Sequence, residues 1–265
     1  MGRDAATIYI FKRDKKMKEQ IDFIIPSFHS EELTTLAIKS FEKFKGNFDF
    51  RYIVVENSDD ISYKDNILAL SKNITWVQNP TNLINSEANA SGLEIGLEHV
   101  KSDYVFFSHN DVVACHPDWM NFLYSKISEK CKLSGTVLDN VRINAVHVSG
   151  YLTTTEIAKN MPLYPVYKNN LQIKDVGDGA TEYCRKNNLQ YFCCQNTEND
   201  DILVELCKEP YKGFRVDRAL NDDNEVIFLH LGRGTPKAMG TYTKQNRIYL
   251  DDWVKFINAN ILNDS

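Results

Sequence analysis

Three kinds of segment are missing from the 265 residues of the sequence. No apolar run approaches the roughly 20 residues that cross a bilayer, and no signal peptide is recognisable at the N-terminus. No G-x-G-x-x-G follows an apolar run, and no glycine-rich phosphate loop follows the first of these runs. These absences exclude a dinucleotide oxidoreductase and disfavour a nucleotidyltransferase. They also predict a cytoplasmic protein whose contact with a membrane is at most peripheral, at its inner face.

Excess positive charge is also missing. The chain carries 31 Lys and Arg against 36 Asp and Glu, which gives a net charge of −5 and a pI near 5.7. Because sequence-independent binding of nucleic acid needs a basic surface, we expect no nucleic-acid partner. The lysine-rich stretch Lys12–Lys18 (KRDKKMK) is either a contact for anionic lipid or a solvated segment.

Cysteine is present without the spacing of a metal site. None of the six cysteines forms the repeated C-x-x-C of a zinc site. Without a signal peptide, a reducing compartment is the simpler interpretation, and we expect free thiols.

Short apolar runs alternate with helical patterns in the first half of the chain. Buried strands are predicted at Ile21–Ile25, Arg51–Val55, Thr75–Val77 and Tyr104–Phe107. Ser30 is the predicted N-cap of a helix that continues to Phe44, and a second helix over 86–100 carries small residues at Ala88, Gly92 and Gly96. This alternation predicts an α/β fold with a mostly parallel central sheet flanked by helices. We expect a single domain over residues 21–265 after an N-terminal extension of residues 1–20.

The second half is less regular. It predicts a strand at Ile143–Val148, a turn at Gly150, a helix at Gly179–Asn187 and a strand at Val226–Leu231.

Polar residues follow three of the predicted strands. In an open parallel sheet, the segments Pro26–Phe28, Glu56–Asp60 and His109–Asp111 converge outside the carboxyl ends of the strands. A carboxylate there can hold a hard divalent cation that in turn binds a diphosphate, which makes Asp111 the strongest candidate. The alternative is that Asp111 caps a turn.

The segments FIIPSF, VVENSD, NPTNLINSEANASGLEIGLE and SDYVFFSHNDVV occur in the order typical of family 2 glycosyltransferases. The chain resembles the bacterial rhamnosyltransferase-like branch of that family over Ile21–Trp119, with weaker similarity as far as Gly234. The resemblance implies the GT-A fold, with a donor half at about 21–119 and an acceptor half at about 120–265. It implies a nucleoside-diphosphate sugar donor, Mn²⁺ or Mg²⁺, and a glycan or lipid-linked glycan acceptor in surface polysaccharide synthesis.

The same resemblance implies roles for individual residues. Asp111 matches the metal-binding aspartate of the family, while His109 and Asn110 stand where the family has further acidic residues. The donor-binding residues that the resemblance implies are Pro26, Ser27, Glu56, Asn82, Asn89 and Asn110. Arg233 is added to them because of its place between two glycines. Trp119 and Gly150 match acceptor-side positions or are core and turn residues.

Two later segments complete the predicted site. Asp178 precedes a helix where the family places its general base, with Asp175 and Glu182 as substitutes and a helix N-cap as the alternative role. His230 ends a strand before Gly232-Arg233-Gly234, where an imidazole can complete a metal site or, when protonated, bind phosphate. Arg233 would neutralise a diphosphate.

These residues predict a metal-assisted transfer with inversion, in which Asp178 deprotonates the acceptor. Two alternatives stay open. A retaining GT-A enzyme is one, because the acidic pair of the family is absent here. A noncatalytic domain that binds nucleotide sugar or a protein partner is the other.

Overall fold

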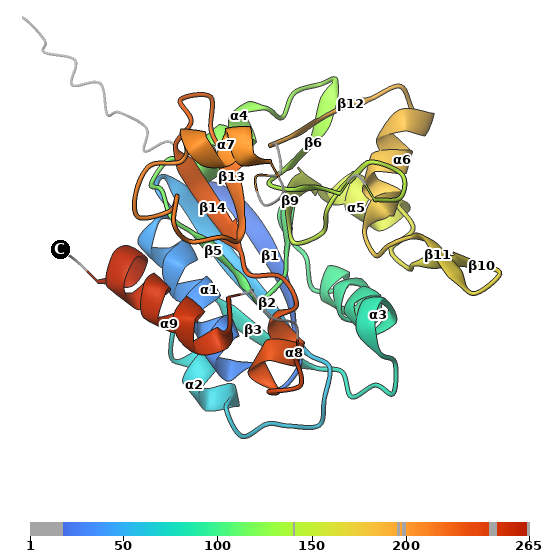
Figure 1. Cartoon of the computed structure of the whole chain (residues 1–265). Coiled ribbons are helices and arrows are strands. Elements are labelled where there is room, and N and C mark those ends of the chain that lie inside the picture. Colours follow the sequence, from blue (N-terminus) through green and yellow to red (C-terminus); the bar gives the residue numbers. More distant parts are fainter. Residues whose placement is uncertain (1–17, 140, 195–196, 198–199, 244–247, 264–265) are drawn as a thin grey trace, which may run out of the picture.

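The structure, a computed structural model, describes residues 18–139, 141–194, 197, 200–243 and 248–263 (Figure 1). Of the lysine-rich stretch Lys12–Lys18, all but Lys18 lies outside the described residues. Within the described residues no helix is long and apolar enough to cross a membrane.

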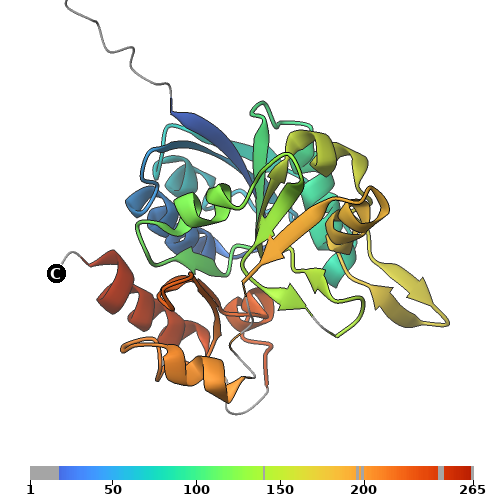
Figure 2. The ribbon, with the colours of Figure 1, turned by 90° about the horizontal axis from the view of Figure 1, so that it is seen from above.

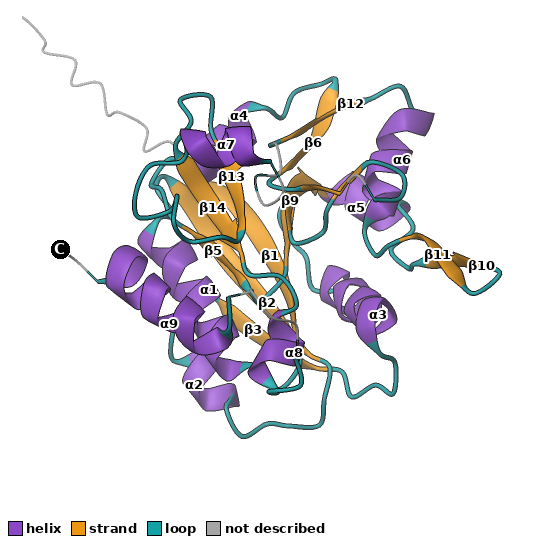
Figure 3. Ribbon diagram, in the orientation of Figure 1, coloured by secondary structure: helices purple, strands orange, loops and turns teal. Residues whose placement is uncertain are grey.

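A seven-stranded sheet forms the centre of the molecule (Figure 3). Its strands, in spatial order, are β12 (Gln190–Cys193), β6 (Cys131–Gly135), β9 (Gly150–Thr154), β4 (Tyr104–Ser108), β1 (Glu19–Ser27), β2 (Phe48–Glu56) and β3 (Ile74–Gln78). Strands β4, β1, β2 and β3 run parallel to one another, and only β9 is antiparallel to its neighbours. The predicted mostly parallel sheet is therefore confirmed.

A second sheet of three antiparallel strands lies against the first. It consists of β13 (Asp217–Leu220), β14 (Val226–His230) and β5 (Val112–Ala114). Two short ribbons complete the strands: β7 (Leu138–Asp139) with β8 (Ala145–Val146), and β10 (Val166–Lys168) with β11 (Leu171–Lys174).

The helices are α1 (Glu31–Lys43), α2 (Lys64–Leu68), α3 (Asn85–Leu97), α4 (Trp119–Ser125), α5 (Thr155–Asn160), α6 (Asp178–Lys186), α7 (Asp201–Leu206), α8 (Gly234–Ala238) and α9 (Leu250–Ile257), followed by a π-helical turn at Asn258–Leu262. Alternating side chains of the central strands bury two different cores, as the period of two in a strand requires. Phe23 and Tyr52 pack with α1, α2 and α4, whereas Ile24 and Ile53 pack with α3, α5 and α6. Helices therefore cover both faces of the sheet.

The small-residue face of α3 brings this helix close to the sheet, as predicted. A Cβ on Gly96 would lie 2.3 Å from Cγ2 of Ile24, and one on Gly92 would lie 3.1 Å from Cβ of Pro26. Larger side chains at these two positions would push α3 away from β1.

Two expectations are wrong. The predicted strand Ile143–Val148 is reduced to the two residues of β8, because Asn144 has a left-handed backbone and His147 enters a turn in which its Nδ1 accepts the Ser149 N–H. Ser30 stands at the N-cap position of α1, but its hydroxyl donates to the Phe28 carbonyl instead of capping the helix. Trp119 is fully buried in the aromatic core, which agrees with the core role that the sequence left open for it.

The described cysteines are all free thiols, as expected.

Candidate functional site

Asp111 lies in the short link between β4 and β5, at the carboxyl end of β4. Its carbonyl accepts the Leu231 N–H at 2.9 Å, and its Oδ2 accepts the Gly234 N–H at 2.9 Å. A Cβ on Gly234 would lie 2.3 Å from Cβ of Asp111, so only glycine permits this approach. The backbone of the predicted Gly232-Arg233-Gly234 segment thus contacts Asp111 directly, through Gly234.

The other carboxylate oxygen of Asp111 is buried and makes no hydrogen bond with any described residue. His230 Nε2 lies 3.5 Å from this Oδ1, and His109 Nδ1 lies 3.7 Å from it. One ligand atom from each of these residues lies within 4.8 Å of the other two. We call His109, Asp111 and His230 the Asp111 cluster. It unites the two predicted metal ligands, Asp111 and His230, with the neighbouring His109.

Two residues behind the Asp111 cluster orient its imidazoles. Asp217 Oδ2 lies 3.2 Å from His230 Nδ1, which turns Nε2 toward Asp111. The Asn89 amide lies 2.9 Å from His109 Nε2, so Nδ1 is the nitrogen that faces Asp111. Such outer hydrogen bonds set the ring orientation of metal-binding histidines. Asn89, predicted as a donor contact, lies beside the cluster.

The three side chains of the Asp111 cluster differ in how their pKa values are shifted. Burial lowers the pKa of His109 to about 4. Burial also acts against protonation of His230, but Asp111 and Asp217 outweigh it and raise the pKa of His230 to about 10. Burial acts against ionisation of Asp111, but His230 and then His109 hold its pKa below the ordinary value. Without a metal, the site therefore pairs a carboxylate with an imidazolium.

His147 connects the Asp111 cluster to a group of carboxylates. Its ring centroid lies 5.4 Å from that of His109 and 5.7 Å from that of His230, and burial lowers its pKa to about 3. On its other side, one nitrogen lies within 4.8 Å of oxygens of Asp139 and Asp175. Arg142 is hydrogen-bonded to both carboxylates, so an internal cation already compensates their charge.

Asp178, the predicted general base, is the first residue of α6 and belongs to this carboxylate group. Its Oδ2 accepts the Asp175 N–H at 2.7 Å and lies 4.0 Å from Arg142 Nε. Burial raises the pKa of Asp178 to about 6, although the Asp175 N–H and Arg142 act in the other direction. Asp178 is only 2% exposed, whereas Asp175 is partly exposed. Glu182, the other substitute, is paired with Lys174 at 2.7 Å.

The residues predicted to line the nucleotide pocket form a closed network. Glu56 is fully buried, and its Oε1 accepts the N–H groups of His29 and Ser58, both at 3.2 Å, and the Ser58 hydroxyl. Its Oε2 accepts the Tyr63 hydroxyl. Ser27 Oγ in turn lies 3.1 Å from the Tyr63 hydroxyl. We call these contacts the Glu56 network. Its carboxylate joins the loops that follow β1 and β2.

The remaining predicted donor contacts are dispersed. Pro26 packs against α3 at Gly92, and Asn110 is buried with its amide 3.4 Å from Thr34 Oγ1. Asn82 and Arg233 are exposed, and Arg233 has a left-handed backbone (φ 57°) before α8.

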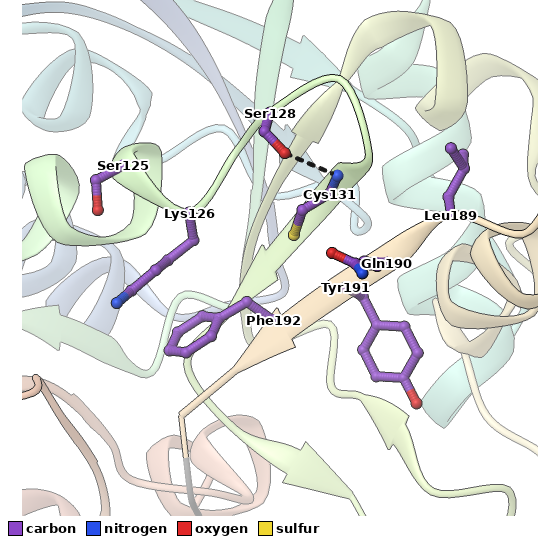
Figure 4. A pocket seen from close by; sticks show the side chains of 8 residues that line it. All are labelled: Ser125, Lys126, Ser128, Cys131, Leu189, Gln190, Tyr191 and Phe192. Carbon is purple, nitrogen blue, oxygen red and sulfur yellow. Dashed lines mark hydrogen bonds between the residues drawn. The ribbon is translucent and has the colours of Figure 1, made fainter.

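A separate shallow hollow lies between the start of β6 and β12 (Figure 4). Lys126, Cys131, Gln190 and Phe192 contribute to its wall, and the Ser128 hydroxyl accepts the Cys131 N–H at 3.0 Å. None of its lining residues belongs to the Asp111 cluster.

No protein-family model and no curated protein matches the chain. Among solved structures, the chain is similar to the mannosyltransferase PcManGT of Pyrobaculum calidifontis in complex with GDP-mannose and Mn²⁺, with a TM-score of 0.52 and 11% identity. The match covers 71% of this chain and 61% of that one, so the chain spans less than two thirds of the mannosyltransferase. Glucosyl-3-phosphoglycerate synthase of Mycobacterium tuberculosis with Mg²⁺ and UDP aligns with a TM-score of 0.49 and 14% identity, over 67% of this chain and 69% of that one.

The fold is GT-A. In this GT-A chain, sequence analysis missed His147, Asp217, Asp139 and Arg142, all of which lie within or beside the site. His147 falls in the segment that was mistaken for a strand, and Asp217 lies on a strand that no periodicity predicted. A signal for His147 was present, because it is a titratable residue between apolar neighbours in Ala145-Val146-His147-Val148.

Proposed function

We propose that the protein is a metal-assisted glycosyltransferase that uses a nucleoside-diphosphate sugar. The observation that carries this proposal is the Oδ1 atom of Asp111, which is buried without a hydrogen bond among the described residues and is flanked by two imidazoles. A buried carboxylate is costly unless it is paired, and without a metal its partner is the protonated His230. A divalent cation that displaces the His230 proton would take over this pairing. Its place at the carboxyl end of β4 is where open α/β sheets bind their ligands.

The residues of the Asp111 cluster fit a divalent cation. One carboxylate and two imidazoles form a mixed oxygen and nitrogen set, which suits Mn²⁺ better than Mg²⁺ because Mg²⁺ prefers oxygen and water ligands. The mannosyltransferase of similar fold was solved with GDP-mannose and Mn²⁺, in agreement with this choice. When bound, the cation would supply positive charge to the departing diphosphate.

Other residues of the chain would prepare the site for the donor. Asp217 and Asn89 hold the two imidazoles in place, and Gly234 fixes the carboxylate of Asp111 through its N–H. The exposed guanidinium of Arg233, one residue before Gly234, would contact the diphosphate as a charge-assisted donor. Pro26, Ser27, Glu56, Asn82, Asn89 and Asn110 complete the proposed donor half of the site, in which the buried Glu56 would hold the loops after β1 and β2 in place instead of touching the donor.

On the acceptor side we assign the general base to Asp178, in an inverting transfer. A base works best when its pKa is near the working pH, and the pKa of Asp178 is raised to about 6. Its burial requires that Asp175 or Arg142 move aside before an acceptor hydroxyl reaches Oδ2. Asp175, which is more exposed, is the competing base.

The acceptor class follows only from the sequence resemblance. We propose a glycan or lipid-linked glycan of a bacterial surface polysaccharide, as in the rhamnosyltransferase-like branch of family 2, handled at the cytoplasmic face of the membrane. The donor half would occupy about residues 21–119 and the acceptor half about 120–265.

Calorimetric titration with Mn²⁺, followed by UDP, GDP, dTDP and CMP in separate runs, tests the donor site. We expect Mn²⁺ to bind and one nucleotide to bind only in its presence, and Asp111→Asn to abolish both. The matched control is Asp223→Asn, an exposed aspartate in the turn between β13 and β14, at the opposite end of β14 from His230, which should leave both unchanged.

Failure of every nucleotide to bind, with or without Mn²⁺, would contradict the transferase proposal. If one nucleotide binds but the protein neither transfers the sugar of the corresponding nucleotide sugar nor hydrolyses it, the noncatalytic alternative replaces the transferase proposal. The anomeric configuration of the product separates inversion from retention.

A further inference from the structure

The ribbon formed by β10 and β11 projects from the body of the molecule in both views (Figures 1 and 2). We call residues Val166–Lys174 the hairpin arm. Its large apolar side chains face solvent: Leu171 is 71% exposed, Tyr167 49%, Val166 40% and Ile173 39%. Such a concentration of apolar residues on a projecting element marks a binding surface more often than chance exposure.

The hairpin arm cannot cover these side chains by itself. Residues directly opposite each other in an antiparallel pair point to the same face, and the register pairs Tyr167 with Gln172 and Lys168 with Leu171. Tyr167 and Leu171 therefore lie on opposite faces of the ribbon. A protein that packs against one face would leave the other in water, whereas a lipid headgroup layer surrounds an inserted ribbon on both faces.

The charge of this region also favours a membrane. The chain as a whole carries −5, yet the stretch 157–174 contains three lysines and no Asp or Glu. Lys174 is paired with Glu182, while Lys159 and Lys168 are exposed. Two such arms from two copies of the chain would repel each other, but an anionic surface would attract them.

We propose that the hairpin arm docks the protein on an anionic lipid surface. The arm combines a tyrosine, exposed aliphatic side chains and Lys168, which is paired with Leu171 next to the turn at Asn169 and Asn170. Aromatic, aliphatic and basic side chains together stabilise binding at the headgroup interface. A further exposed apolar residue, Ile84 (69% exposed), lies two residues before Ser86, whose Oγ is 3.4 Å from Gln172 Nε2 of the arm.

Docking in this way would bring lipid close to the candidate site. Lys174 ends the arm, and the next residue, Asp175, belongs to the carboxylate group beside His147. An acceptor carried by the membrane would therefore arrive next to Asp175 and Asp178. The docking itself does not depend on the proposed transferase activity and is tested without it.

Co-sedimentation of the full chain with vesicles tests the proposal. We expect binding to phosphatidylcholine vesicles that contain phosphatidylglycerol, weak binding to phosphatidylcholine alone, and a decrease at high salt. The double variant Tyr167→Ser/Leu171→Ser should lose about tenfold in partitioning, because it removes two of the largest inserted side chains. Lys168→Glu should lower binding severalfold, only to the anionic vesicles.

Matched controls use exposed residues away from the arm. Ile202→Ser, on a side chain 77% exposed in α7, and Lys39→Glu, on an exposed position of α1, should leave partitioning unchanged. Unchanged thermal unfolding would show that each variant is folded.

Three results would overturn the proposal. The first is no binding to anionic vesicles. The second is binding that the double variant does not weaken, which would assign the contact to Lys12–Lys18. The third is self-association in sedimentation velocity that the double variant abolishes, since this would make a second copy of the chain the partner.

Discussion

Asp111 and Glu56 are buried carboxylates at the same edge of the central sheet, on the two sides of β1, and they differ in what surrounds them. The Glu56 network supplies internal donors to both carboxylate oxygens. In the Asp111 cluster, one oxygen has the Gly234 N–H and the other has no hydrogen bond among described residues. A carboxylate whose two oxygens both accept internal hydrogen bonds stabilises the fold. A carboxylate with one oxygen that accepts none can bind an external cation through that oxygen.

The largest effect that separates the two regions is expected from Gly234→Ala. The new Cβ would lie 2.3 Å from Cβ of Asp111 and must displace it, so we expect Mn²⁺ affinity to fall about 100-fold. Calorimetry measures the Kd. Gly213→Ala is the control, because the nearest atom to its new Cβ is Glu209 Oε2 at 3.8 Å. An unchanged Kd in Gly234→Ala would place the metal elsewhere.

Glu56→Gln is expected to lower the stability of the protein and to leave Mn²⁺ affinity almost unchanged. The variant removes a buried charge that accepts several hydrogen bonds, so the free energy of unfolding should fall by about 2–3 kcal/mol. The Kd for Mn²⁺ should change less than threefold, because Glu56 does not contact the Asp111 cluster. Urea denaturation gives the stability, with the exposed Glu94→Gln as control. If Glu56→Gln unfolds no more easily than Glu94→Gln, the Glu56 network is not structural.

A third change tests whether support from outside the Asp111 cluster matters. Asp217→Asn should weaken Mn²⁺ binding about tenfold, because it loosens the orientation of His230 without removing a ligand. Thermal unfolding should change little by comparison. A Kd equal to that of the intact protein would mean that the β-strand alone positions His230.

A fourth prediction concerns Asp178, which is buried and accepts the Asp175 N–H through Oδ2. Its folded pKa, raised to about 6, exceeds its ordinary value, so its contribution to stability is present below about pH 4 and is lost as the pH rises through about 6. Between pH 4 and pH 7, Asp178→Asn should therefore gain about 2 kcal/mol of stability relative to the intact protein, because the pKa of Asp178 is raised by about two units. Unfolding curves at both pH values measure this difference. A difference that is constant with pH would contradict the raised pKa.

The comparison also explains what the sequence could predict. Short apolar runs that end in polar clusters predicted β1, β2, β4 and the edge of the sheet where Glu56 and Asp111 lie. The pattern could not distinguish Glu56, whose oxygens both accept hydrogen bonds, from Asp111. The partners of Asp111 come from β14 and Gly234, more than a hundred residues away in the sequence. His147 was missed for a related reason: a left-handed residue at Asn144 and a turn replaced the strand that its apolar neighbours predicted.

The pairing of β14 with β5, which sets His230 opposite Val112, makes the Asp111 cluster a late product of synthesis and folding. Nearly half of the chain separates Asp111 from His230, and closing a loop of that length costs entropy before any contact forms. A cation that binds both residues joins the two ends of that loop and stabilises only the finished chain. A ribosome-bound fragment that stops before residue 226 contains every residue of the Glu56 network but lacks His230 of the proposed metal site. If the proposed site binds a metal, binding would report that the second sheet has closed onto the first.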